Sequence, residues 1–199
     1  MTLRSPSQEQ LSAATPEELA ALAAECLTRL EPGRQPLPLF TQLGRLTVLS
    51  TVEIVPLRAS SSILEVLLAP RPATDPWWPN QWHLPGSVLL PSDAGTGLGD
   101  YDAIADRILG SEFRNTVARK GNVHIFDAKC RSGVRGSEQT VFGWTEVDLA
   151  EGATKPFGGR FFEAKGILTE PFPADIIVGH DETIRLALAD YRLNQSQVA

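Results

Sequence analysis

The chain has few cysteines, no cysteine motif and no long apolar run, and each absence excludes a class of protein. Cys26 and Cys130 are the only cysteines among 199 residues, which excludes a disulfide scaffold and a zinc site of the usual spacing. No stretch approaches the roughly 18 apolar residues that a membrane span needs. The first ten residues lack the apolar core of a secretory signal. We therefore expect a reduced, cytoplasmic setting.

The chain also has fewer basic than acidic residues. The chain carries 18 Lys and Arg against 24 Asp and Glu, a formal net charge of -6. This balance argues against non-specific binding to nucleic acid or to anionic membranes. With 42% hydrophobic and 21% charged residues, the composition is that of one ordinary globular domain with room for an appendage.

The appendage is predicted at residues 1–40 as a helical extension. Thr15 precedes Pro16 and two glutamates, a pattern typical of a capped helix start. An apolar stripe at helical spacing follows: Leu19, Leu22, Ala23, Cys26, Leu27 and Leu30. Pro32 and Gly33 end the helix. Such a stripe has to cover something, either the main domain or a partner chain, so a homodimer through this helix is one expectation.

Residues 41–199 alternate between β-rich and helical segments. Residues 46–57 and 63–68 predict one hairpin, and residues 122–128 and 140–147 predict a second. Helices are predicted over 100–113 and from His180 or Asp181 to Leu193, with a short strand or turn at 160–167. The order of elements predicts an α/β class.

Two segments carry a recognisable motif. Trp82-His-Leu-Pro-Gly-Ser87 is followed, on the helix predicted over 100–113, by Arg107-Ile-Leu-Gly-Ser-Glu112. Together they resemble the box of the Nudix hydrolase family, which runs Gly, five residues, Glu, seven residues, Arg-Glu, an aliphatic residue, any residue, Glu-Glu, any residue, Gly. The resemblance implies a Nudix-like α/β/α sandwich with a mixed β-sheet over residues 41–199.

The match to that box is partial. Ser87 stands at the first Gly, and Asp93 stands at the first Glu, one methylene shorter. Six residues around 94–99 are inserted before Arg107, which matches. Glu112 keeps the second glutamate of the Glu-Glu pair. The pattern therefore retains one carboxylate before the helix and one on it.

The remaining two helix carboxylates of the family are missing. Ile108 and Ser111 stand in their places, on the same helix face as Glu112. An isoleucine cannot ligate a metal, and a neutral hydroxyl is a poor substitute for a carboxylate. The spacing also puts Ile108 on the apolar stripe of this helix. We therefore expect hydrolysis by the family mechanism to be weak or absent.

The resemblance implies the site that such a hydrolase would use. Mg²⁺ or Mn²⁺ would neutralise a pyrophosphate and activate water, with Glu112 as principal ligand and Asp93 in support. Arg107 would orient one of these two acids. The alternative for Glu112 is a structural ion pair with Arg107 or Arg114, without a metal. A further ligand would come from Glu138, Glu146, Glu163 or Glu170, of which Glu163 is our first choice.

The candidates for substrate binding precede the helix. Arg71 is suited to phosphate, and Trp82, Gly86 and Ser87 belong to the motif segment. The tryptophans of the loop, Trp77, Trp78 and Trp82, either stack on a nucleobase or plug the loop. The histidines, His83, His124 and His180, share no partner spacing and are expected at the surface or at a helix cap.

Two functions from different classes remain open. The first is a divergent Nudix-type pyrophosphohydrolase acting on a nucleoside diphosphate derivative, with activity weak or lost. The second is a non-hydrolytic module that binds a nucleotide-type small molecule or a protein, which the missing carboxylates favour. A purely structural partner subunit is the third possibility.

Overall fold

Two units make up the chain in the computed structural model, which describes residues 8–31, 35–60, 63–96, 100–169 and 175–198. The first unit is Met1–Arg34 and the second is Gln35–Ala199. The second unit begins six residues before the boundary expected from the sequence. The segment 35–40, which we assigned to the extension, is therefore grouped with the larger unit.

The first unit contains α1 (Gln8–Ala13) and α2 (Pro16–Leu27), and α2 is the predicted capped helix. Thr15 Oγ1 accepts a hydrogen bond from Glu18 N at 3.2 Å, and the Glu18 carboxylate accepts one from Thr15 N at 2.8 Å. This reciprocal pair satisfies two donors at the helix start. No residue of α2 is buried. The predicted stop at Pro32 and Gly33 lies outside the described residues.

The second unit is built on a mixed sheet whose strands, as far as the structure describes the chain, number eight. Its main path runs β3-β2-β1-β7-β5, with β4 on β1, β6 on β7 and β8 on β2. The strands are β1 (Val48–Ala59), β2 (Leu64–Pro70), β3 (Trp82–His83), β4 (Gly86–Val88), β5 (Val117–Arg119), β6 (His124–Gly133), β7 (Gly136–Leu149) and β8 (Arg160–Glu163). The helices are α3 (Leu37–Leu46), the 3-10 turn η1 (Pro91–Thr96), α4 (Tyr101–Glu112), α5 (Ala164–Thr169) and α6 (His180–Val198).

Both predicted hairpins are confirmed. In the first, β1 and β2 pair antiparallel with Leu57 opposite Val66. In the second, β6 and β7 pair antiparallel as far as Gly133 opposite Gly136. The two hairpins join through the parallel pair β1–β7, which makes the sheet mixed, as the resemblance implied.

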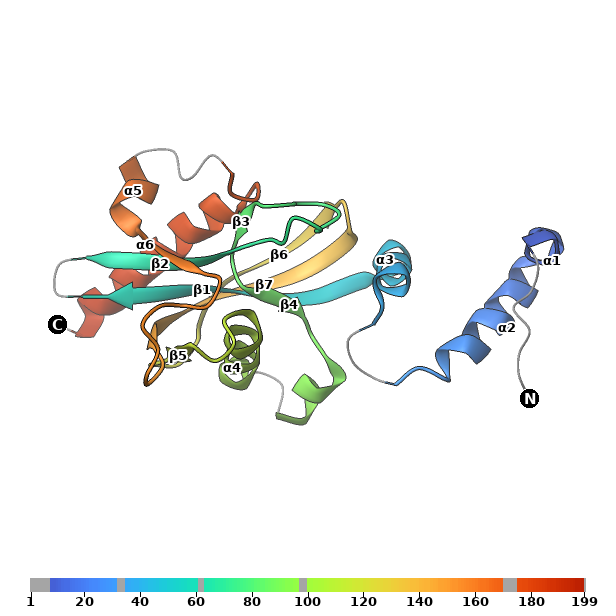
Figure 1. Ribbon diagram of the computed structural model, residues 1–199, viewed down its shortest axis with the longest axis horizontal. Helices are drawn as coiled ribbons and strands as arrows, with labels where there is room; N and C mark the ends of the chain where they lie inside the picture. Colours follow the sequence, from blue (N-terminus) through green and yellow to red (C-terminus); the bar gives the residue numbers. More distant parts are fainter. Residues whose placement is uncertain (1–7, 32–34, 61–62, 97–99, 170–174, 199) are drawn as a thin grey trace. The chain divides into compact units, whose positions relative to one another are not determined.

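The helices α4 and α6 cover opposite faces of this sheet (Figure 1). On β1, Val52 and Ile54 pack against Ile108 of α4, which is 3% exposed and lies on the apolar stripe as predicted. Val55 and Leu57 pack instead against α6. Because strand side chains alternate between faces, Glu53 lies on the α6 side. The fold is therefore the α/β/α sandwich expected from the sequence.

The helix α3 of the second unit was missed by the sequence prediction. Pro36 is its N-cap residue and Pro38 lies in its first turn, where proline is tolerated because the backbone N–H has no acceptor within the helix. Gly44 of α3 lies against the turn of the β6–β7 hairpin. A Cβ at Gly44 would stand 2.3 Å from the carbonyl oxygen of Arg135, so glycine is needed for this close approach. The helix therefore supports the hairpin turn.

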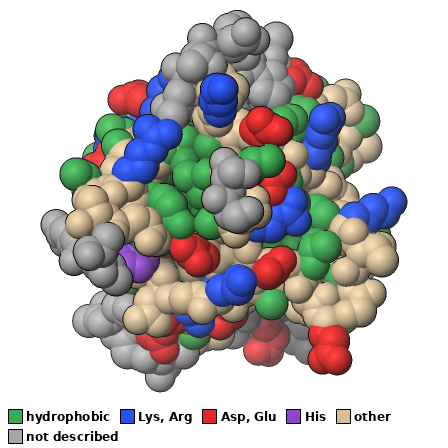
Figure 2. Space-filling model, turned by 90° about the vertical axis from the view of Figure 1, so that its left-hand side faces the viewer, with side chains coloured by type: hydrophobic (Ala, Val, Ile, Leu, Met, Phe, Trp, Pro, Cys, Tyr) green, Lys and Arg blue, Asp and Glu red, His purple; other side chains and the backbone are tan. Residues whose placement is uncertain are grey.

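The face seen in Figure 2 carries a central group of hydrophobic side chains with acidic and basic side chains interspersed around it. Neither sign of charge dominates this face. Separately, none of the helices in the described ranges is long and apolar enough to cross a membrane.

Candidate functional site

A cavity of about 280 Å³ lies where β1, β4, the β6–β7 hairpin and the start of α6 meet. It occupies the α6 face of the sheet, because Thr51 and Glu53 of β1 line it. Gly86 and Ser87 of the motif segment also line it. The remaining lining residues are Arg71, Trp78, Leu84, Val88, Arg131, Ser132, Gly133, Val134, Arg135, Glu138, Ile177, Val178 and His180.

Three arginines and two buried glutamates dominate the chemistry of this cavity. Arg131 donates from Nη2 to Glu53 Oε1 at 2.6 Å. Arg135 Nη2 lies 2.7 Å from Glu138 Oε1. Glu53 and Glu138 are 7% and 6% exposed, so both carboxylates depend on these cations for their burial. Arg71 Nη1 lies 3.9 Å from Asp75 Oδ2, so each arginine of the cavity has a carboxylate partner.

The loop after β2 holds Arg71 and Trp78 at the cavity. Asp75 Oδ1 accepts hydrogen bonds from Trp77 N and Trp78 N at 2.9 and 2.8 Å, which fixes the turn. The guanidinium carbons of Arg135 and Arg71 lie 5.0 and 6.0 Å from the Trp78 ring centroid. Trp78 is therefore engaged by two arginines, which favours a role in positioning them over one as a stacking platform for a base.

Burial and neighbouring charge affect the cations of this site. Burial lowers the pKa of Arg71 from its ordinary value, Arg135 lowers it further, and Asp75 and Glu112 oppose the change. The guanidinium stays protonated, because its ordinary pKa exceeds 12. Two buried nitrogens, Arg71 Nε and Arg135 Nε, have no hydrogen-bond partner within the described part of the chain.

His180, expected at the surface or at a helix cap, is the first residue of α6 and a buried member of the cavity lining. It is 5% exposed. Leu84 N donates to its Nδ1 at 2.9 Å, so the neutral ring carries its proton on Nε2. Burial, followed by the charges of His83 and Arg131, lowers the pKa of His180 to about 3. The ring is therefore neutral near pH 7.

Asp93 and Arg107 form a two-pronged ion pair. Arg107 donates from Nε to Asp93 Oδ1 at 2.8 Å and from Nη2 to Asp93 Oδ2 at 2.7 Å. Asp93 Oδ2 also accepts from Leu90 N at 2.8 Å, and Arg107 Nη1 donates to Ser87 Oγ at 3.3 Å. Of the two acids considered for Arg107, the structure selects Asp93. The contact ties α4 to η1 and to the motif segment.

Glu112 pairs with a buried histidine. His83 Nε2 lies 3.2 Å from Glu112 Oε1, and His83 Nδ1 lies 2.6 Å from the carbonyl oxygen of Leu84. A carbonyl only accepts, so Nδ1 carries a proton and donates. The contact between His83 Nε2 and Glu112 Oε1 is attractive only if a proton also lies between these two atoms. His83, expected at the surface, is 2% exposed and holds the one glutamate that the helix retains.

The other predicted site residues separate into two groups. Arg71, Gly86 and Ser87 line the cavity. Trp82 packs edge-on against Phe162, with ring centroids 5.0 Å apart, on the core cluster of β1, β2 and α6. Of the tryptophans in that loop, it is Trp78 that lines the cavity.

Glu163 lies far from the cavity. It is opposite Glu65 on β2, which is opposite Arg58 on β1, five residues beyond Glu53. At 3.3 Å per residue, this places Glu163 about 17 Å along the strands from Glu53. Glu138 lines the cavity, Glu146 accepts from Tyr191 at 2.9 Å, and Glu170 lies outside the described residues.

These acids do not fit the magnesium site that the resemblance implies. The two oxygens of Asp93 accept three hydrogen bonds, Glu112 faces a histidine that carries a proton, and Glu163 is remote. Within the described residues, no group of three His, Cys, Asp or Glu side chains is placed to hold a metal ion. The donor set that Mg²⁺ requires, several oxygens converging on one point, is not what these acids provide.

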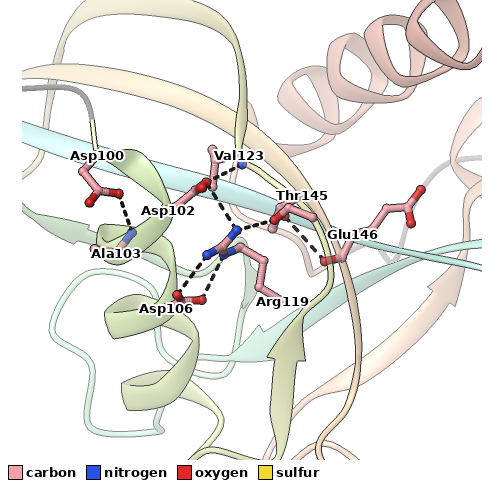
Figure 3. Close-up of polar contacts among 9 residues, drawn as sticks. Asp100, Asp102, Ala103, Asp106, Arg119, Val123, Thr145 and Glu146 are labelled. Carbon is pink, nitrogen blue, oxygen red and sulfur yellow. Dashed lines mark hydrogen bonds and ion pairs between the residues drawn. The ribbon is translucent and has the colours of Figure 1, made fainter. Parts of the chain in front are cut away.

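Acidic residues at the start and in the first half of α4 cap this helix and connect it to β5 and the loop after β5 (Figure 3). Asp100 caps the helix by accepting from Ala103 N at 3.1 Å. Asp102 accepts from Val123 N at 2.7 Å and lies 3.3 Å from Arg119 Nη1. Arg119 also donates to Asp106 at 3.0 Å. These acids of α4 are therefore structural partners of β5 and of the loop that follows it.

Sequence reasoning named Glu138 only among possible further ligands, and it missed four other residues of the cavity: Glu53, Arg131, Arg135 and His180. One signal was available, because Glu53 interrupts an otherwise apolar strand, Val52-Glu53-Ile54-Val55. A charge in a buried strand requires a partner. The partner itself, Arg131, is 78 residues away, and only the register of β1, β7 and β6 brings the two together.

No protein-family model matches the chain, and no curated protein matches it in sequence. Solved structures do match it. The Nudix domain of Shewanella oneidensis NrtR, complexed with ADP ribose, gives a TM-score of 0.50 at 18% identity and covers 85% of this chain and 97% of that one. A MutT/nudix family protein from Enterococcus faecalis gives 0.51 at 16% identity, covering 95% and 76%. A mutT/nudix family protein from Listeria innocua gives 0.50 at 14% identity, covering 76% and 99%. The chain therefore has the Nudix fold, as the resemblance implied.

Proposed function

We propose that this chain binds a phosphate-bearing small molecule of the nucleotide type in the arginine-lined cavity, and that it hydrolyses this molecule weakly or not at all. The observation that supports binding is the convergence of Arg71, Arg131 and Arg135 on one cavity. A guanidinium group can donate two parallel hydrogen bonds to two oxygens of one phosphate. Here Arg71 Nε and Arg135 Nε are buried without a hydrogen-bond acceptor in the described part of the chain, and a phosphate group would supply one.

The ligand class follows from the fold and from one structural neighbour. The Nudix domain of NrtR is complexed with ADP ribose, a nucleoside diphosphate derivative. The cavity of this chain uses Gly86 and Ser87 of the motif segment as part of its wall. We therefore propose ADP ribose and related compounds as the first ligands to test.

The proposal of weak hydrolysis depends on the contacts that the candidate metal-binding carboxylates make. When bound, Mg²⁺ or Mn²⁺ would neutralise the pyrophosphate and activate water. Asp93 and Glu112, the acids proposed to hold it, are instead paired with Arg107 and His83. In this proposal the arginines supply the positive charge for binding, and Arg107 keeps the motif segment in place.

The test measures binding and turnover separately. Isothermal titration with ADP ribose in EDTA should show binding, and Arg135→Ala should weaken it about 10- to 100-fold, the usual range for a hydrogen bond to a charged group. Arg58→Ala is the matched control, because Arg58 pairs with Glu65 outside the cavity.

Turnover is measured with ADP ribose, nucleoside diphosphate sugars, dinucleotides and nucleoside triphosphates, each with Mg²⁺ or Mn²⁺. Robust hydrolysis that Glu112→Gln abolishes would overturn the proposal in favour of the enzyme. Absence of binding to every compound would overturn it altogether, leaving a protein-binding or structural role.

A further inference from the structure

Glu53 carries a buried carboxylate oxygen that the protein itself does not use. Its side chain is 9% exposed, and Oε1 accepts from Arg131 at 2.6 Å. Oε2 is buried and has no hydrogen-bond partner in the described part of the chain. A buried acceptor on a charged group is costly when it is left unpaired. Glu53 lines the cavity, so a ligand hydroxyl that approaches its carboxylate would give this oxygen a donor.

The surroundings of Oε2 leave the position open to a ligand. His180 Nε2 lies 3.7 Å from Oε2, beyond hydrogen-bond distance. Directly across the β1–β4 pair stands Gly86. A Cβ at this position would come within 2.9 Å of Glu53 Cγ. The absence of a side chain at Gly86 thus preserves the space beside the carboxylate.

The unpaired polar atoms of the cavity residues indicate which chemical groups a ligand needs in order to bind there. Oε2 of Glu53 needs a hydrogen-bond donor, whereas Arg71 Nε and Arg135 Nε need acceptors. A single ligand meets both needs if it carries a phosphate and a hydroxyl group. The volume of about 280 Å³ is slightly below the roughly 300–1,000 Å³ of most ligand pockets. Trp78 is already engaged by two arginines, so the cavity suits a sugar phosphate better than a base.

We infer that Glu53 is a specificity residue whose Oε2 accepts a hydrogen bond from a sugar hydroxyl, while the arginines hold the attached phosphate. This inference rests on the proposed function, because it concerns the same cavity. It goes beyond that function in assigning the sugar-phosphate part of the ligand to the cavity, with any base outside it. The predicted consequence is discrimination between a sugar phosphate and a phosphate that has no hydroxyl-bearing group.

The experiment compares D-ribose 5-phosphate with methyl phosphate by isothermal titration at constant pH and salt. Wild-type protein should prefer ribose 5-phosphate about 10- to 100-fold, the value of a hydrogen bond to a buried charge. In Glu53→Gln the amide oxygen stays with Arg131 and a neutral NH₂ group faces the hydroxyl. The preference should then fall about 3- to 10-fold, because a neutral hydrogen bond is about half as strong as a charge-assisted one.

Two variants serve as controls. Glu138→Gln alters the other cavity carboxylate, whose Oε1 is held by Arg135, so it should change the affinity for both ligands by the same factor and leave the preference intact. Glu65→Gln breaks an ion pair outside the cavity and should change neither affinity. Melting temperatures confirm that each variant is folded.

The outcomes separate the two proposals. If wild-type protein binds neither ligand, the proposed function fails. If it binds both equally, or if Glu53→Gln keeps the full preference, the proposed function stands and the role of Glu53 is refuted. Should Glu53→Gln not fold, 2-deoxyribose and ribose 5-phosphates and methyl phosphate are compared on wild-type protein, and affinities that do not rise with the number of hydroxyls refute the inference.

Discussion

Replacing Arg107 by alanine tests whether Asp93 is a structural partner of this arginine. The Asp93 side chain is 9% exposed, and without Arg107 its nearly buried carboxylate would lose two charge-assisted hydrogen bonds. Breaking a buried ion pair costs about 3–5 kcal/mol, and the 27% exposure of the Arg107 side chain reduces our expectation to about 2–3 kcal/mol.

The assay is urea unfolding followed by tryptophan fluorescence. With a slope of about 2 kcal/mol per molar urea, the midpoint should fall by about 1–1.5 M. Arg107→Lys keeps the charge but not the two-pronged geometry, so it should recover only part of the loss. Lys120→Ala is the control, because the Lys120–Asp148 pair is half-exposed and should be worth less than about 1 kcal/mol. A loss for Arg107→Ala no larger than this control would refute the structural role of the pair.

Two further perturbations test the cavity walls. Gly136 has φ +114°, and a Cβ there would stand 1.9 Å from Gly44 O, so Gly136→Ala should distort the hairpin turn and weaken phosphate binding. Gly121→Ala, with nothing within 4 Å, is its control in the same titration. His180 has a folded pKa of about 3 against an ordinary value of 6.5, so the unfolded chain binds a proton first as the pH falls. Between pH 7 and 5 this residue should cost about 2 kcal/mol of stability, and His180→Gln should remove that part of the pH dependence of urea unfolding; an unchanged slope would contradict the buried neutral ring.

The secondary structure was largely predictable because local patterns specify it. The β-branched runs predicted both hairpins, and the capped apolar stripes predicted α2 and α4. Two helices were missed. α3 depends on packing its Gly44 against the hairpin turn, a contact that local spacing does not reveal, and α5 (Ala164–Thr169) lies partly in the segment 160–167 that we expected to be a strand or a turn.

The candidate site was predictable only in part. The resemblance to the motif identified Gly86, Ser87, Asp93 and Arg107 as candidate site residues. The partner of Glu112 was missed because His83 lies 29 residues earlier and is buried through β3, a strand of two residues. Arg131 and Arg135 were missed for a related reason. Their importance arises from the register of β6 on β7, which places them at the same cavity as Glu53.

The central claim is that arginines, and not metal-bound carboxylates, hold the phosphate of the ligand. It is tested most directly by titrating ADP ribose into wild-type protein, Arg135→Ala and Glu112→Gln, each in EDTA and then in Mg²⁺. The account predicts binding in EDTA that Arg135→Ala weakens at least tenfold and that Glu112→Gln changes less than threefold. Binding that requires Mg²⁺ and disappears in Glu112→Gln while surviving in Arg135→Ala would contradict it.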